Sequence, residues 1–130
     1  RPARSTQGVS SAASDVYKRQ VFGHPQVASV GLTERDAREQ GLSIVVALKD
    51  YGATAYGWAM EDSQGFCKLI VDAESRQLLG AHLIGPQASS LIQSLVQGME
   101  FGQTVDQLAS QQFYIHPALT EVIENALLEV

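Results

Sequence analysis

His116 and Glu121 are the side chains of this sequence whose types and spacing best support chemistry, because an imidazole stands five residues before a carboxylate. Imidazole is the side chain whose unperturbed pKa lets it accept and donate a proton near neutral pH. A carboxylate that bonds one ring nitrogen fixes the ring and makes the other nitrogen a better base. The segment therefore predicts a proton-transfer pair.

A purely structural interpretation of His116 competes with this one. Proline is favoured at the first position of a helix, where its missing N–H costs nothing, so His116-Pro117 is also a plausible helix start. Two observations favour the proton-transfer role of His116 over the structural one. Glu121 falls in the first turn of the predicted helix, within reach of the ring. A residue before proline is kept out of the helical conformation, which directs His116 away from the helix.

The other residues with reactive or metal-binding side chains predict structural roles. We expect His24 on the surface, His82 in a structural position on a strand, and Cys67 as a small buried side chain. Their spacing matches no short metal-ligand pattern, so no metal site is predicted. A single cysteine also excludes an intrachain disulfide, a CxxC redox pair and a cysteine-based zinc site. The sequence contains no GxGxxG, GxxxxGK[ST] or GxSxG motif.

The elements that must position His116 and Glu121 follow from the hydrophobic periodicity. Strands are predicted over residues 26–32, 43–49, 65–72 and 77–84, the last two as a hairpin, with a short helix from Thr33 to Gly41. After residue 86 the apolar period changes from 2 to 3.6. It predicts a helix over residues 88–99, a short helix capped by Thr104, and a final helix from about Ala118. Strands followed by helices indicate an α+β fold, an antiparallel sheet with helices packed on one face.

Two segments leave alternatives open. Residues 51–60 are ambiguous, and a strand with an irregular loop is the expectation. Their large side chains, Tyr56, Trp58 and Met60, are either core or a contact for a substrate or partner. The apolar stripe of residues 88–99 is either core or, in part, an interface with a second subunit.

Length and composition bound the remaining possibilities. The 130 residues, 45% hydrophobic and 18% charged, suit one soluble domain, and no apolar run is long enough to cross a membrane. Residues 1–20 contain four basic and one acidic side chain, whereas residues 21–130 contain five and thirteen. The excess of negative charge over residues 21–130 disfavours nucleic-acid binding, because a nucleic-acid backbone is itself negatively charged. The single cysteine fits a reducing, cytoplasmic compartment.

The first twenty residues differ from the rest. They are rich in Ser, Ala and Arg without helical or strand period, and residues 9–20 resemble translated sequencing-adapter sequence. We therefore expect a non-native or disordered leader over residues 1–20, with a transit peptide as the alternative, and a domain over residues 21–130 cut from a longer protein.

Three segments resemble, in the family's order, the C-terminal dimerisation domain of the pyridine nucleotide–disulfide oxidoreductases. They are residues 21–34 (VFGHPQVASVGLTE), residues 79–85 (LGAHLIG), and His116-Pro117 followed by Glu121 (HPxxxE). The resemblance covers residues 21–130. Within the family, residues 50–52, 55–62, 87–93 and 115–119 are similar to a member that reduces another low-molecular-weight disulfide. Ala118 stands where members that reduce glutathione or lipoamide usually carry Thr.

The resemblance implies roles for particular residues. His116 would be the acid–base group that protonates the departing thiol, supplied to the neighbouring subunit, and Glu121 would orient it. The His116-Pro117 bond would be cis, with the backbone of both residues beside the flavin of the other subunit. Glu124, Asn125 and Met60 would face the disulfide substrate.

The resemblance also implies cofactors and partners. The full-length enzyme would be a cytoplasmic homodimer that uses FAD and NADPH, with no nucleic-acid or membrane partner. The FAD and NADPH domains and a CxxxxC redox pair would lie outside this chain, which would bind no cofactor and have no reductase activity alone. Two alternatives remain. One is the same domain of a member that acts on lipoamide, glutathione or mercuric ion. The other is a non-catalytic dimerisation or protein-binding module.

Overall fold

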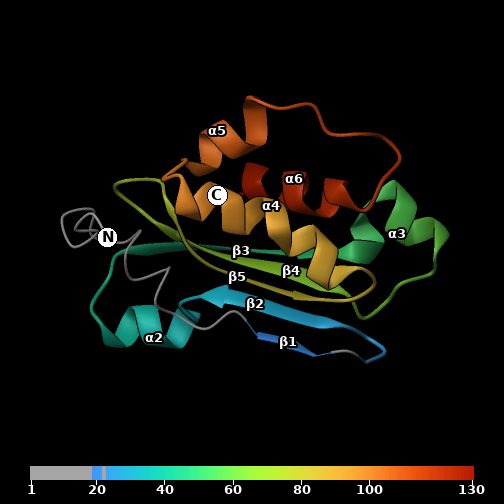
Figure 1. The fold of residues 1–130 in the computed structure, drawn as a ribbon, viewed down its shortest axis with the longest axis horizontal. Coiled ribbons are helices and arrows are strands. Elements are labelled where there is room, and N and C mark those ends of the chain that lie inside the picture. Colours follow the sequence, from blue (N-terminus) through green and yellow to red (C-terminus); the bar gives the residue numbers. More distant parts are fainter. Residues whose placement is uncertain (1–18, 22) are drawn as a thin grey trace.

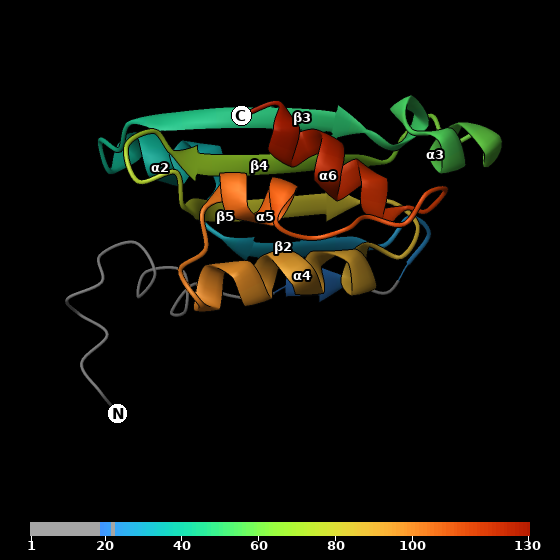
Figure 2. The same ribbon diagram turned by 90° about the horizontal axis from the view of Figure 1, so that it is seen from above.

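The structure, a computed structural model, describes residues 19–21 and 23–130 as one antiparallel sheet with helices on both faces (Figures 1 and 2). The expectation of a leader over residues 1–20 falls outside these residues except for Arg19 and Gln20, which lie in the first strand, and it stays a prediction. The elements in chain order are β1 (Arg19–Val21), β2 (Val27–Gly31), α2 (Glu34–Glu39), β3 (Ile44–Asp50), the 3₁₀ turn η2 (Tyr51–Ala53), α3 (Ala55–Ala59), β4 (Phe66–Asp72), β5 (Leu78–Ile84), α4 (Ala88–Glu100), α5 (Val105–Ser110) and α6 (Thr120–Leu128).

The five strands are ordered β1-β2-β5-β4-β3, and every neighbouring pair is antiparallel. The predicted hairpin is β4–β5, which lies at the centre of the sheet with a bulge between Ile70 and Val71. Helices α4, α5 and α6 lie on one face (Figure 1), where α4 packs on β2 and β5, and α6 packs on β3 and β4. This confirms the predicted α+β class.

The apolar stripe of α4 is core. Its buried residues are Ala88, Leu91, Ile92, Leu95 and Met99. Val96 is partly buried and packs against the same cluster. The outward face of α4 holds exposed polar side chains, among them Gln93 and Gln97. The stripe therefore packs within this chain, because the sheet is wide enough to cover it.

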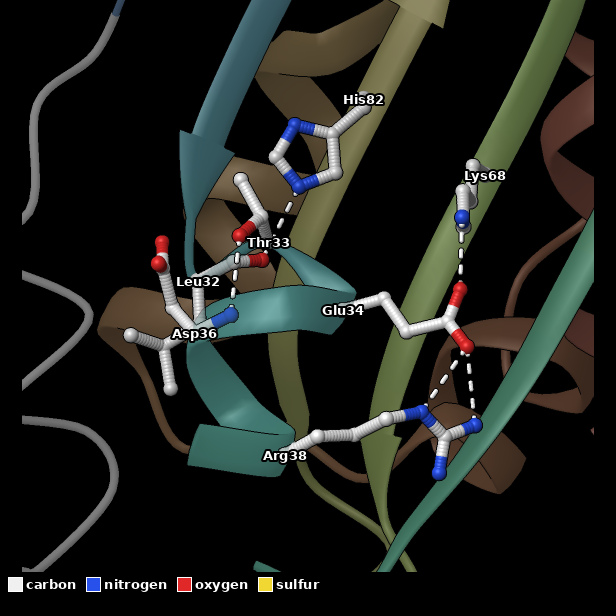
Figure 3. Close-up of polar contacts among 7 residues, drawn as sticks. All are labelled: Leu32, Thr33, Glu34, Asp36, Arg38, Lys68 and His82. Atoms are coloured by element: carbon white, nitrogen blue, oxygen red, sulfur yellow. Dashed lines mark hydrogen bonds and ion pairs between the residues drawn. The ribbon is translucent and has the colours of Figure 1, made fainter. Parts of the chain in front are cut away.

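Helix α2 lies on the opposite face of the sheet, an arrangement that strand-and-helix order alone does not predict. Ala37 packs there against a small separate cluster that includes Ile70 and Leu79. Glu34 links the helix to the sheet by accepting from Lys68 Nζ at 2.7 Å, and it also pairs with Arg38 at 2.8 Å (Figure 3). These two cations hold the pKa of Glu34 below its ordinary value.

His82 has the structural role predicted for it. Its Nε2 donates to the carbonyl oxygen of Leu32 at 2.9 Å (Figure 3), since a carbonyl can only accept. Its Nδ1 lies 2.8 Å from the hydroxyl of Ser29. The imidazole thus joins β5 to β2 and to the start of α2. Cys67 is fully buried, and burial raises the pKa of its thiol to about 12, so it behaves as a small apolar side chain.

Residues 51–60 form η2 and α3, so the expected strand with an irregular loop is wrong. The hydroxyl of Thr54 caps α3 by accepting from the Gly57 N–H at 3.1 Å. Gly57 is required because a Cβ there would lie 1.9 Å from the carbonyl oxygen of Tyr51. Trp58 is 76% exposed, with Tyr56 and Met60 also exposed. The core interpretation of these side chains is therefore wrong as well.

Tyr51 is the buried anchor of this segment. Its ring is 0% exposed and fills the space beside Gly65 and Gly85, where an added Cβ would lie within 2.9 Å of ring atoms. Its hydroxyl finds no hydrogen-bond partner within the described chain, and burial raises its pKa. The hydroxyl oxygen of Tyr51 is therefore a buried polar atom without a hydrogen bond in the described chain.

Replacing Tyr51 with Phe should keep the packing and remove only the unpaired oxygen. Because a buried polar group without a partner costs free energy, we expect Tyr51→Phe to raise the free energy of unfolding by about 1 kcal/mol. Urea denaturation of both proteins measures the difference. A loss of stability would mean that this hydroxyl makes a stabilising hydrogen bond.

The described residues contain no helix long and apolar enough to span a membrane. Nor do they bring three or more His, Cys, Asp or Glu side chains together in a group that could hold a metal ion.

Candidate functional site

His116 lies in the loop that connects α5 to α6. This loop runs to the end of the molecule where α3 also lies (Figures 1 and 2). Its side chain is 69% exposed, and the His116–Pro117 peptide bond is cis, as the resemblance implied. The chain turns at Ala118 and Leu119 before α6 begins at Thr120. The loop therefore exposes the imidazole of His116 on the surface of the domain.

Glu121 holds the ring of His116. Its Oε1 lies 2.6 Å from Nδ1 of the imidazole, and its Oε2 accepts from the backbone N–H of Ala118 at 3.2 Å. The Glu121 side chain is 16% exposed, so the carboxylate is largely sheltered while the imidazole is open. The other ring nitrogen, Nε2, makes no hydrogen bond with the described part of the chain, which leaves it available for proton exchange.

The surroundings of Glu121 favour its ionised form. The hydrogen bond with His116 is the largest influence and lowers the pKa of this carboxyl below its ordinary value, against an opposing effect of burial. The N–H of Ala118 lowers the pKa further. Glu121 also lies in the first turn of α6, where exposed backbone N–H groups favour negative charge. A permanent carboxylate is what the proton-transfer pair requires.

The lowered pKa of Glu121 makes stability depend on pH. A carboxyl whose folded-state pKa is below its unfolded value stabilises the fold above the unfolded pKa, and this contribution disappears as the pH falls through the folded pKa. We expect Glu121→Gln to be less stable than the unmodified chain at neutral pH and the gap to close as the pH drops below the ordinary value of 4.5. Urea denaturation across this pH range measures the gap.

The matched control is Glu74→Gln, which neutralises an exposed side chain in the β4–β5 turn. Its stability should follow that of the unmodified chain at every pH. A gap for Glu121→Gln that stays constant down to low pH would contradict the pairing of its carboxylate with His116.

The remaining predicted substrate residues are Glu124, Asn125 and Met60. Glu124 and Asn125 follow one turn further along α6, and both are half-buried. Met60 follows α3 and is 44% exposed. It lines a hollow of about 340 Å³ whose lining residues do not include His116. The structure thus brings His116 and Glu121 together, and a substrate role for Glu124, Asn125 or Met60 stays a prediction.

Sequence reasoning missed one feature of the site. The backbone N–H of Ala118 as a second partner of Glu121 depends on the turn before α6, which periodicity does not reveal. It also missed helix α3, although Thr54 stands three residues before Gly57, a helix-capping spacing. Trp58 of α3 is exposed, which fits the contact alternative left open for this side chain.

Residues 17–127 match the model of the family described as pyridine nucleotide-disulphide oxidoreductase, dimerisation domain. The chain belongs to this family. Mycothione reductase of Mycobacterium tuberculosis is 59% identical over 108 residues, which are 83% of this chain and 24% of that protein. Dihydrolipoyl dehydrogenase of Haloferax volcanii is 38% identical over 111 residues, 82% of this chain and 23% of the relative. The chain therefore spans about a quarter of the length of the curated relatives that it matches.

Solved structures agree with this assignment. The HOCl-induced flavoprotein disulfide reductase RclA from Escherichia coli shares 30% identity and a TM-score of 0.81, covering 88% of this chain and 26% of its own. LpdA from Mycobacterium tuberculosis also gives a TM-score of 0.81, over 87% of this chain and 24% of LpdA. At 23% identity, this likeness supports the fold alone. Mycothione reductase is the member that residues 50–52, 55–62, 87–93 and 115–119 indicated, and its 59% identity to this dimerisation domain confirms that resemblance.

Proposed function

We propose that this chain is the dimerisation domain of an NADPH- and FAD-dependent disulfide reductase that acts on mycothione, and that it supplies an acid–base pair to the active site of the partner subunit. The observation that supports the proposal best is the 2.6 Å contact between Nδ1 of His116 and Oε1 of Glu121, with Nε2 directed to no described residue. A sheltered carboxylate behind an exposed imidazole is the arrangement that general acid–base catalysis uses.

In the proposed reaction a substrate disulfide is split into two thiols. A cysteine thiolate in the remainder of the protein would attack one sulfur of the substrate disulfide, forming a mixed disulfide and expelling a thiolate. Nε2 of the protonated His116 would donate a proton to the expelled sulfur. The second cysteine of the pair would then displace the other half of the substrate as its second thiol. Glu121 fixes the ring through Nδ1, so that Nε2 faces outward, and its negative charge stabilises the imidazolium before the transfer. The N–H of Ala118 holds the second carboxylate oxygen, which prevents the carboxylate from rotating away.

FAD and NADPH would supply the two electrons of this reaction through a cysteine pair in the remainder of the protein. The residues of this domain suit a position beside a flavin, because the side chains of residues 115–117 are all exposed and the loop presents itself to a neighbouring molecule. His116 and Pro117 are the residues that would lie against it. A cytoplasmic homodimer without nucleic-acid or membrane partners is part of this proposal.

Sharing of the site between subunits is tested by complementation in the full-length protein. One subunit carries His116→Ala and an intact redox cysteine pair, and the other has an intact His116 and a serine in place of one redox cysteine. If His116 acts on the partner subunit, the mixed dimer contains one complete site and recovers about half of the normal activity. If the histidine serves its own subunit, no site is complete and the mixed dimer is as inactive as its parents.

The substrate is tested separately, by comparing kcat/KM of the full-length enzyme for mycothione, oxidised glutathione and lipoamide, and for mercuric ion. Preference for mycothione supports the proposal, and preference for one of the others assigns the domain to a different member of the family. A full-length protein with no disulfide reductase activity would leave the non-catalytic dimerisation module as the explanation. The complementation result does not depend on which disulfide is used.

A further inference from the structure

Tyr114 is partly buried, whereas every other residue from Gln111 to Pro117 is exposed. Phe113 on one side is 104% exposed and Ile115 on the other is 75% exposed. Tyr114 instead packs against the core cluster between the sheet and its helices. The loop that presents His116 is therefore attached to the core of the domain by Tyr114 before the histidine and by Leu119 after it.

The hydroxyl of Tyr114 closes a small network on α5. It donates to the carbonyl oxygen of Leu108 at 2.9 Å, and Gln112 Nε2 lies 2.9 Å from both of these oxygens, donating to each. The Leu108 carbonyl is in the last turn of α5, where helical acceptors lack a partner within the helix. The tyrosine and glutamine thus satisfy this acceptor and join the loop to the end of α5.

Helix α5 is a firm support for this attachment. The side chain of Leu108 is 4% exposed and packs against Gly98 of α4, where an added Cβ would lie 2.8 Å from its methyl carbons. Burial, with the nearby charge of Glu124 on α6, raises the pKa of Tyr114 to about 12. The hydroxyl therefore stays protonated and remains a donor to Leu108 across the physiological pH range.

We infer that Tyr114 is a positioning residue for His116, holding the loop so that the imidazole meets Glu121 and presents Nε2 to the neighbouring subunit. The inference rests on the proposed function of His116. Reacting groups must be held within a fraction of an ångström for efficient transfer, and a loop attached at one end only would spread the imidazole over many positions. Tyr114 acts through this constraint and does not itself touch the reacting atoms.

The test is a double-mutant cycle in the full-length enzyme. Tyr114→Phe removes only the hydroxyl, and we expect it to lower kcat by about 3- to 10-fold, the effect of one hydrogen bond, with KM unchanged. Gln112→Ala, which removes the other donor, should act in the same direction. In the His116→Ala background Tyr114→Phe should have no further effect. Tyr51→Phe, which removes a buried hydroxyl without a partner in the described chain, is the matched control and should leave kcat unchanged.

A second readout separates positioning from general stability. In the 130-residue chain, carbon-13 NMR follows the titration of the Glu121 carboxyl, and Tyr114→Phe should move its pKa toward the ordinary value as the pair with His116 loosens. Unchanged titration of Glu121, or an equal loss of kcat in both backgrounds, would overturn the inference. If His116→Ala alone retains full activity, the proposed function fails, and this result is distinguishable from a failure of the Tyr114 inference.

Discussion

His116→Ala in the full-length enzyme is expected to lower turnover of its disulfide substrate by about 10²- to 10⁴-fold, the usual contribution of a positioned acid–base group. The substitution removes Nε2, the nitrogen of this ring that Glu121 does not bind, while Glu121 keeps its backbone partner at Ala118. Without an acid within reach, the leaving thiolate must take its proton from water. Steady-state kinetics at saturating NADPH measures the loss.

The control for this experiment is the reaction with NADPH alone, because in the proposed mechanism the flavin would be reduced before the thiol is released and without use of the imidazole. Its rate should be unchanged in His116→Ala, and light scattering should give the same mass as for the unmodified enzyme. Retention of the full rate of disulfide reduction by a correctly assembled His116→Ala enzyme would contradict the assignment of His116 as the proton donor.

Gly80→Ala should destabilise the domain by about 3 kcal/mol, because the added methyl group would meet backbone. A Cβ at Gly80 would lie 1.9 Å from the carbonyl oxygen of Leu32, and Leu32 lies directly before the cap of α2. The same carbonyl accepts from Nε2 of His82, so it cannot move away without breaking that hydrogen bond. Thermal denaturation should show a melting temperature lower by roughly 10 °C.

Gly23→Ala is the matched control for this substitution. Gly23 is exposed, and its nearest neighbour to an added Cβ is the carbonyl oxygen of Pro25 at 3.7 Å, an ordinary contact. Its melting temperature should stay within about 1 °C of the unmodified value. Equal stability of Gly80→Ala and the unmodified chain would show that β2 and β5 can separate at this point without cost.

The parts of the fold that could be predicted from the sequence are those decided by neighbours along the chain. The capping box of Thr104 and Gln107 is present in both directions, at 2.9 and 3.1 Å, because it needs only two side chains and a helix start. The stripe of α4 is buried because a period of 3.6 places its apolar side chains on one face. The pairing of His116 with Glu121 follows in the same way from a spacing of five residues.

The parts that could not be predicted depend on contacts between distant segments. For residues 51–60, whose pattern is ambiguous, the expectation is a strand with an irregular loop. The segment instead forms η2 and α3, because Thr54 caps a turn and Tyr51 is held beside Gly85, which is distant in sequence. The face occupied by α2 depends on the alternation of Ile70 with Leu69 and Val71 along β4, which buries side chains on both sides. The cap at Thr54 is a local signal, but the anchoring of Tyr51 and the face of the sheet that α2 covers are not.

Both hydrogen bonds that Glu121 makes within the described chain come from residues within five positions of it, His116 and Ala118. The pairing is therefore encoded in one short stretch of sequence, whereas the placement of its loop depends on Tyr114 and α5. Core substitutions away from Tyr114 and α5 should alter how much folded protein a cell contains and leave the pairing in each folded molecule the same.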